Sequence, residues 1–309
     1  MNASGFGSEI ELVSTAGPRL GRRSFVRNAG LLGLGAAAAA GVNLVSPTHA
    51  RAEGRETAAE RQEEREQHKD TVTEIFTAAL IAEDLATTFY YNALVGPVIQ
   101  DPNLAGKGGA ATHVTAAGNF GNVAYIRAAL TEEIEHANLF RTLLGIPNSS
   151  KDPYQTFHFP SGSFDTLTAF TGLLDALENA FIGAYLNAIQ EFSRLAARER
   201  LRTYLGDDGP KDAFTAEQLE YFAKVAASIM GIEAEHRVLG RVISNSNPAN
   251  NLAYEQTDGL NAVYNGPKSA VAALTPFLTP STGPAFSFAY AIANHGSVSQ
   301  PVTGAPPAF

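Results

Sequence analysis

Two copies of one short pattern, Glu-x-x-His, occur in this chain of 309 residues. They are Glu133 with His136 and Glu233 with His236. Residues three apart on a helix point to the same side, so the carboxylate and the imidazole of each pair can bind one metal ion. Of the seven histidines, only these two fall inside segments whose pattern predicts a long helix. The spacing therefore favours a metal site over a charged, solvent-facing helix surface.

Two further glutamates, Glu83 and Glu178, lie among apolar residues in the other two long predicted helices. Four carboxylates buried together would repel one another and lose their hydration, which two divalent cations would offset. The chain has no cysteine, so any metal site must be built from carboxylate and imidazole. Such an oxygen-rich ligand set suits iron or manganese.

The polar residues of the first two predicted helices recur in the last two at constant offsets. The offset is 95 residues from the first helix to the third (83 to 178) and 100 from the second to the fourth (133 to 233). The matched pairs are Glu83 and Glu178, Tyr90 and Tyr185, Glu133 and Glu233, and His136 and His236. This regularity indicates an internal duplication of a helical hairpin.

Capping patterns and breakers predict where these helices begin and end. Thr71 with Glu74, and Thr215 with Gln218, have the capping-box spacing. Ser163 resembles the N-cap of the third helix. The predicted helices span 71–95, about 119 or 121–144, 163–205 and 215–244. No convincing run of alternating residues predicts strands, so the expected fold class is all-α, a bundle of four helices over residues 71–244.

The first 52 residues are expected to be a twin-arginine signal peptide. Arg22 and Arg23 precede an apolar stretch rich in Gly and Ala, and Ala50 and Ala52 give a small-x-small cleavage pattern. An uncleaved membrane anchor is the alternative, but the stretch is shorter than the roughly 20 apolar residues of a span. We therefore expect export to the periplasm or beyond, without stable membrane insertion after cleavage. Residues 53–70 read as a polar linker.

The rest of the composition limits the partners. The formal net charge is −9 and the body of the chain has no basic cluster, so nucleic acid is not expected as a partner. Residues 245–309 are rich in Asn, Pro, Gly and Ser, which predicts a long, loop-rich and irregular C-terminal extension. That extension could bury an apolar surface between two subunits, which allows a homodimer.

The ligand pattern resembles the ferritin-like superfamily of di-iron and di-manganese carboxylate proteins, in which two helices each supply a Glu and two others each supply Glu-x-x-His. Within that superfamily the chain looks most like the desiccation-related group. The resemblance implies a ferritin-like four-helix bundle with two metal sites. One would have Glu83, Glu133 and His136, and the other Glu178, Glu233 and His236. It also favours Glu133 and Glu233 as bridging ligands, with Glu83 and Glu178 terminal.

The resemblance implies redox chemistry on two iron ions, or alternatively two manganese ions. The substrates would be O₂, peroxide or Fe(II), and the activity that of a ferroxidase, peroxidase, catalase or oxidase. No haem is expected, because Met230 is the only methionine besides Met1 and is interpreted as a core residue. The alternative is a structural, stress-protective envelope protein whose metal ions only stabilise the bundle.

Residues around the ligands have plainer interpretations. Tyr90 and Tyr185 are core residues, hydrogen-bond donors to a ligand across the bundle, or electron donors, and the sequence does not choose among the three. Three other glutamates are expected to face solvent or pair with arginine, and two arginines to cap helix ends. These residues are Glu132, Glu135 and Glu235, and Arg141 and Arg241.

Overall fold

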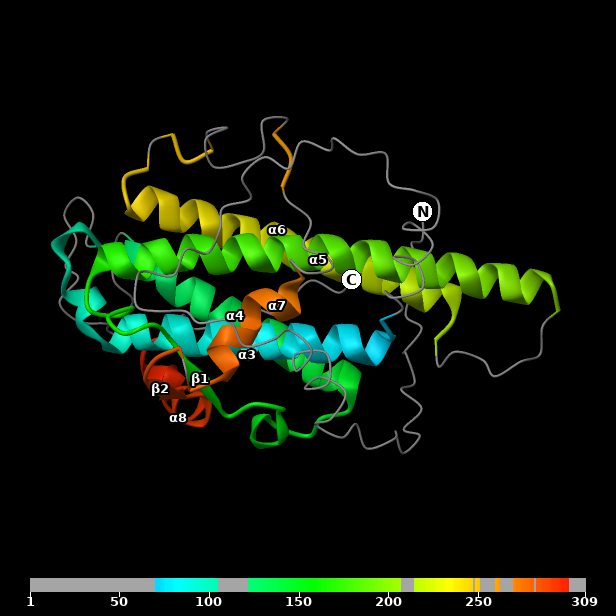
Figure 1. Cartoon of the computed structure of the whole chain (residues 1–309), viewed down its shortest axis with the longest axis horizontal. Coiled ribbons are helices and arrows are strands. Elements are labelled where there is room, and N and C mark those ends of the chain that lie inside the picture. The colour runs from blue at the N-terminus through cyan, green and yellow to red at the C-terminus, as the bar shows by residue number, and fades with distance from the viewer. Residues whose placement is uncertain are drawn as a thin grey trace, which may run out of the picture. The chain divides into compact units, whose positions relative to one another are not determined.

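The computed structural model describes residues 70–104, 122–206, 214–246, 248–250, 259–261, 269–280 and 282–299. Four long helices dominate this part of the chain. They are α3 (Val72–Val95), α4 (Asn122–Leu144), α5 (Leu167–Tyr204) and α6 (Ala216–Ile243). Helix α3 packs along α4, and α5 packs along α6 (Figure 1). The prediction of an all-α four-helix bundle is confirmed, and each predicted hairpin is one packed pair.

The predicted capping boxes are present. At the start of α3 the Thr71 hydroxyl accepts from the Glu74 N–H at 3.2 Å, and the Glu74 carboxylate accepts from the Thr71 N–H at 2.9 Å. Thr215 and Gln218 make the same two bonds at the start of α6. These bonds satisfy backbone donors that a helix start otherwise leaves without partners. Local chemistry therefore places both starts where the sequence predicted them.

The predicted start of the third helix is wrong by three residues, because the N-cap is Thr166 and not Ser163. Thr166 is the N-cap of α5, with its side chain accepting from the Ala169 N–H at 3.1 Å. The Ser163 hydroxyl instead donates to the Pro160 carbonyl at 2.7 Å, in the turn that precedes the helix. Both Ser163 and Thr166 carry a hydroxyl that could cap the helix. Thr166 is the cap, because the hydroxyl of Ser163 is bonded within the preceding turn.

Aromatic layers close the bundle on both sides of its centre. Phe76, about two helical turns before Glu83, packs against one phenylalanine from each of the other three helices. These are Phe140, Phe192 and Phe222, at ring-centroid distances of 5.8, 5.5 and 4.9 Å. Beyond Glu83, Phe89 stacks on Phe170 at 4.8 Å. The polar layer between them is shielded from water at both ends.

In the C-terminal extension the sequence predicted one short helix or packed arm, within residues 260–278, and the described residues contain that helix and further regular structure. They include α7 (Ala270–Leu274), α8 (Phe288–Asn294) and strand β2 (Ala285–Ser287). Strand β2 pairs antiparallel with β1 (Thr156–His158), which lies between α4 and α5, and Phe157 is opposite Phe286. Strands of three residues are too short to show an alternating pattern, so this pairing could not be found from the sequence.

A buried arginine of α4 holds the extension to the bundle. Arg127 is 1% exposed, and its guanidinium donates to the carbonyls of Val298 and Ser299, each at 2.9 Å. Both bonds span more than 170 residues of sequence. The end of the described chain is thereby fixed against the helix that supplies Glu133 and His136.

The two arginines expected to cap helix ends bind carboxylates instead. Arg141 donates to Asp84 at 2.7 Å and to Asp152 at 2.8 Å. Arg241 donates to Asp175 at 2.7 Å. Both arginines lie in the last turn of their helices, as expected, but their buried side chains pair with acidic residues from other elements.

Several expectations concern residues that the structure does not describe. The predicted signal peptide over 1–52, with Arg22 and Arg23, lies outside the described residues, and so does the predicted linker over 53–70 except for its last residue, Asp70. Among the helices that are described, none combines the length and apolarity needed to cross a bilayer.

Candidate metal centre

The structure brings the six predicted ligands together in the middle of the bundle. Helix α3 supplies Glu83, α4 supplies Glu133 and His136, α5 supplies Glu178, and α6 supplies Glu233 and His236. Five of these side chains are at most 4% exposed, and His136 is the exception at 13%. A polar layer this deeply buried is unusual unless its charges are compensated.

Within this layer the ligands form two overlapping sets of four. One set contains Glu83 and His136 and the other contains Glu178 and His236, and both sets contain Glu133 and Glu233. In each set the four candidate ligand atoms lie within 4.8 Å of one another. A carboxylate that bridges two metal ions must belong to both ligand sets, and Glu133 and Glu233 meet this condition.

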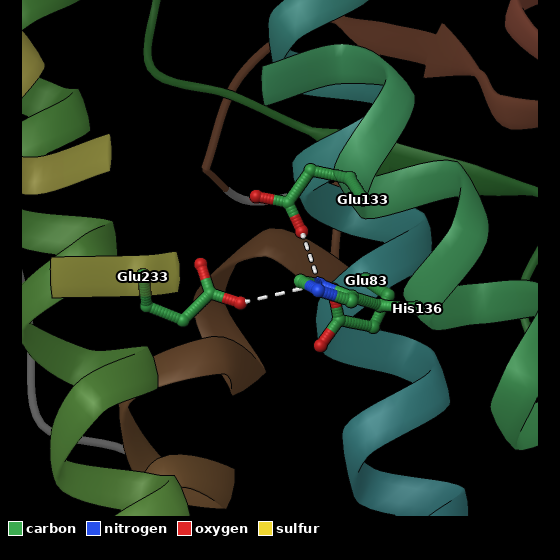
Figure 2. Close-up of side chains that lie close together, drawn as sticks. All are labelled: Glu83, Glu133, His136 and Glu233. Atoms are coloured by element: carbon green, nitrogen blue, oxygen red, sulfur yellow. Dashed lines mark hydrogen bonds and ion pairs between the residues drawn. The ribbon is translucent and has the colours of Figure 1, made fainter. Parts of the chain in front are cut away.

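Figure 2 shows the first set, in which the ring nitrogen of His136 faces the carboxylates of Glu133 and Glu233 and the side chain of Glu83 overlaps the ring in this view. Three carboxylate oxygens surround the Nδ1 atom of this ring. They belong to Glu83 at 3.3 Å, Glu233 at 3.6 Å and Glu133 at 3.7 Å. The ring thus presents one nitrogen to the centre of its set.

The second set repeats this geometry around the Nδ1 atom of His236. Its carboxylate neighbours are Glu133 at 3.1 Å, Glu233 at 3.4 Å and Glu178 at 3.9 Å. Both imidazoles therefore face the shared glutamates with the same nitrogen, and the duplication seen in the sequence extends to the geometry of the site.

Buried atoms without hydrogen bonds test whether these residues fit metal ions. Within the described part of the chain, both carboxylate oxygens of Glu133 and of Glu233 have no hydrogen-bond partner. The same holds for Oε2 of Glu178 and Nδ1 of His236. Leaving such atoms unpaired costs roughly 1–3 kcal/mol each, and more for charged groups. Two divalent cations would coordinate these atoms and balance four carboxylates, so the residues fit a dinuclear centre.

Protonation is the other way to compensate so much buried charge. Burial and the neighbouring carboxylates raise the pKa of Glu133 and raise the pKa of Glu178 well above its usual range. Burial alone would lower the pKa of His136 and His236, but the surrounding carboxylates raise both well above the usual value. Without cations these carboxylates and imidazoles therefore keep their protons to a higher pH than isolated side chains do.

Metal binding is accordingly expected to release protons and to weaken as the pH falls. The ligands must be ionised carboxylates and neutral imidazoles, and the raised pKa values of Glu178, His136 and His236 mean that metal ions compete with protons for these groups up to a higher pH than in isolated side chains. Calorimetric titration with Co(II) in two buffers of different ionisation enthalpy measures the protons released. Equal apparent enthalpies in the two buffers would contradict this expectation.

Two buried tyrosines bind Glu178 and Glu83 in a crosswise manner. The hydroxyl of Tyr90, on α3, donates to Glu178 of α5 at 2.7 Å, and the hydroxyl of Tyr185, on α5, donates to Glu83 of α3. Burial and the adjacent carboxylate raise the pKa of each tyrosine well above its usual value, so both hydroxyls keep their protons and act as donors. Of the three interpretations left open by the sequence, the structure shows two: both rings are buried in the core, and both hydroxyls donate hydrogen bonds across the bundle. Electron donation stays a prediction.

Replacing Tyr90 by phenylalanine is expected to lower the free energy of unfolding by about 1.5–3 kcal/mol, the range for a hydrogen bond to a charged group. The ring and its packing remain, so only the bond to Glu178 is lost. Chemical denaturation of the metal-loaded protein measures the change. Tyr221→Phe is the matched control, because Tyr221 is a partly buried tyrosine packed against Phe222. An equal effect in both variants would mean that the bond to Glu178 contributes nothing.

One residue of the centre was missed by sequence reasoning. Glu132 was expected at the helix surface, but its Oε2 lies 2.8 Å from Nε2 of His236 even though its side chain is 44% exposed. Its position next to Glu133 pointed it away from the ligand face of its own helix. The partner is on another helix, which no spacing within α4 can reveal. Glu135 and Glu235 are exposed.

Comparison with known proteins gives one match. The family model of the ferritin-like domain matches residues 71–220. A search of curated proteins and a search of solved structures each found no match. The match spans α3, α4, α5 and the start of α6 and ends before Glu233, while α6 continues to Ile243 and completes the centre. Residues 71–220, in the all-α bundle that they build, are therefore a ferritin-like domain.

Proposed function

We propose that this protein binds two iron ions in its bundle and uses them to oxidise Fe(II) or to consume peroxide. The observation that supports the proposal most strongly is the pair of ligand sets that share Glu133 and Glu233. Among the described residues, the buried carboxylate oxygens of Glu133 and Glu233 lack hydrogen-bond partners, as expected of atoms that coordinate cations.

The donor set supports the choice of metal. Four carboxylates and two imidazoles, without thiolates, suit iron or manganese better than copper or a structural zinc. When bound, two such ions supply electrons by changing between the +2 and +3 states. Two manganese ions are the alternative, and the same ligands would hold them.

The chain's own residues would position these ions and shield them. Glu133 and Glu233 would contact both ions, while Tyr90 and Tyr185 orient the terminal glutamates through their hydrogen bonds. The aromatic layers on both sides would keep bulk water out. Because His136 is the most exposed of the six ligands, O₂, peroxide or Fe(II) would approach from its side.

We further propose that the protein works outside the cytoplasm, in protection against oxidative or drying stress. Arg22 and Arg23 with the following apolar stretch support twin-arginine export, and the likeness to desiccation-related proteins supports the stress role. Cell fractionation of the wild type and of an Arg22→Lys/Arg23→Lys variant tests the export. The protein should move from the exported fraction to the cytoplasm in the variant. An unchanged distribution would contradict the proposed route.

The first experiment is metal analysis by mass spectrometry on protein purified from its native compartment. About two iron ions per chain are expected, as in other dinuclear bundles of this ligand set. Anaerobic addition of Fe(II), followed by O₂ or peroxide, then tests turnover. Bound metal without consumption of either oxidant would favour the structural role. A folded protein that neither contains metal nor takes up Fe(II) would contradict the metal centre altogether.

A further inference from the structure

The duplication that builds the centre is broken at one contact. On one side, Nε2 of His236 lies 2.8 Å from the carboxylate of Glu132. Because helices α4 and α6 match at an offset of 100, the residue that corresponds to Glu132 is Ile232 (132 to 232), which has no polar side chain. The two histidines therefore have different partners on the side away from the shared glutamates.

The contacts of the other histidine confirm the difference. Within the described residues, the hydrogen bonds and ion pairs of His136 all involve Nδ1, the nitrogen that faces the centre. His136 is also 13% exposed, against 4% for His236. The imidazole of His236 has carboxylate partners at both ring nitrogens and is shielded from solvent. The imidazole of His136 has carboxylate partners at Nδ1 alone, among the described residues, and is partly exposed to solvent.

A carboxylate behind a ligand histidine has a defined effect. Because a carboxylate only accepts hydrogen bonds, Nε2 of His236 must carry a proton, which leaves Nδ1 of the neutral ring with its lone pair toward the centre. The bond also fixes the ring orientation and makes the imidazole a stronger donor to the metal. Losing such a partner typically weakens metal binding by 10–100-fold. His136 lacks this preorganisation.

From these differences we infer that the two metal positions are not equivalent. The position formed with Glu178 and His236 fills first and holds its ion more tightly. The position formed with Glu83 and His136 fills second and exchanges its ion with solvent. Glu132 is the positioning residue that creates the difference. This inference rests on the proposed metal centre.

Stepwise titration of the metal-free full-length protein with Co(II) tests the inference, followed by visible absorption and calorimetry. The wild type should bind in two phases, with the first at least about 10-fold tighter. Glu132→Gln should weaken the first phase by about 10–100-fold and leave the second unchanged, so that the phases merge. Glu132→Asp should restore part of the loss. Glu135→Gln is the matched control, because it removes the same charge from an exposed position on α4.

A variant that adds a carboxylate behind His136 tests the same inference. Ile232→Glu places a carboxylate where the duplication puts the counterpart of Glu132. We expect it to tighten the second Co(II) phase and to leave the first unchanged. Helix content by circular dichroism checks that the partly buried position tolerates the change.

The outcomes separate this inference from the proposed function. Two bound Co(II) ions with equal affinities in the wild type would overturn the inference and leave the metal centre intact. So would equal effects of Glu132→Gln and Glu135→Gln. A folded protein that binds no Co(II) would overturn the metal centre itself and the inference with it.

Discussion

Replacing Glu133 by alanine is expected to remove both metal ions, whereas replacing Glu83 removes only one. Glu133 belongs to both ligand sets, and Glu83 belongs to the set of His136 alone. In a dinuclear bundle, metal content should therefore fall from about two ions per chain to near zero in Glu133→Ala and to about one in Glu83→Ala. Glu233→Ala should behave like Glu133→Ala, because it also contributes to both sets.

Mass spectrometry of metal content after dialysis, with circular dichroism to verify the fold, makes this comparison. Glu135→Ala is the control, since Glu135 is exposed on the same helix and belongs to neither set. Equal loss in Glu133→Ala and Glu83→Ala, with both variants folded, would mean that Glu133 is not shared. A double variant, Glu133→Ala/Glu233→Ala, should bind no metal.

Replacing Arg141 by methionine is expected to lower the free energy of unfolding by about 3–5 kcal/mol, the cost of breaking a buried ion pair by removing one partner. Arg141 is the cation between Asp84 and Asp152, whose side chains are both fully buried. It also lies 5.7 Å from the ring centroid of Phe288, in α8. Its loss would leave two buried carboxylates uncompensated and would loosen α8 from the bundle.

Urea denaturation of the variant and the wild type measures this change. The duplication again provides a control, because Arg241 occupies the matching position and pairs with Asp175, whose side chain is 36% exposed. Water can solvate Asp175 after the replacement, so Arg241→Met should cost less than Arg141→Met. A smaller effect of Arg141→Met than of Arg241→Met would refute the role assigned to this buried group.

Much of the candidate site could be predicted from the sequence because its signals are local. The three-residue spacing of Glu133 and His136 places both on one helix face wherever the helix lies. The repeat of that pair at Glu233 and His236 identifies matching positions without any knowledge of packing. The capping box at Thr71 likewise involves bonds within four residues of chain. Such features depend only on helix geometry, which the local sequence determines.

The tertiary structure alone decided which side chains meet across the bundle. The bond between Glu132 and His236, and the crosswise bonds of Tyr90 and Tyr185, each join two helices. Whether such groups meet depends on how far each helix is rotated and shifted along its neighbour, and no residue spacing within one helix contains that information. The sequence thus determined the candidate ligands and their positions on each helix, while packing decided which partners they contact and gave the two histidines different contacts.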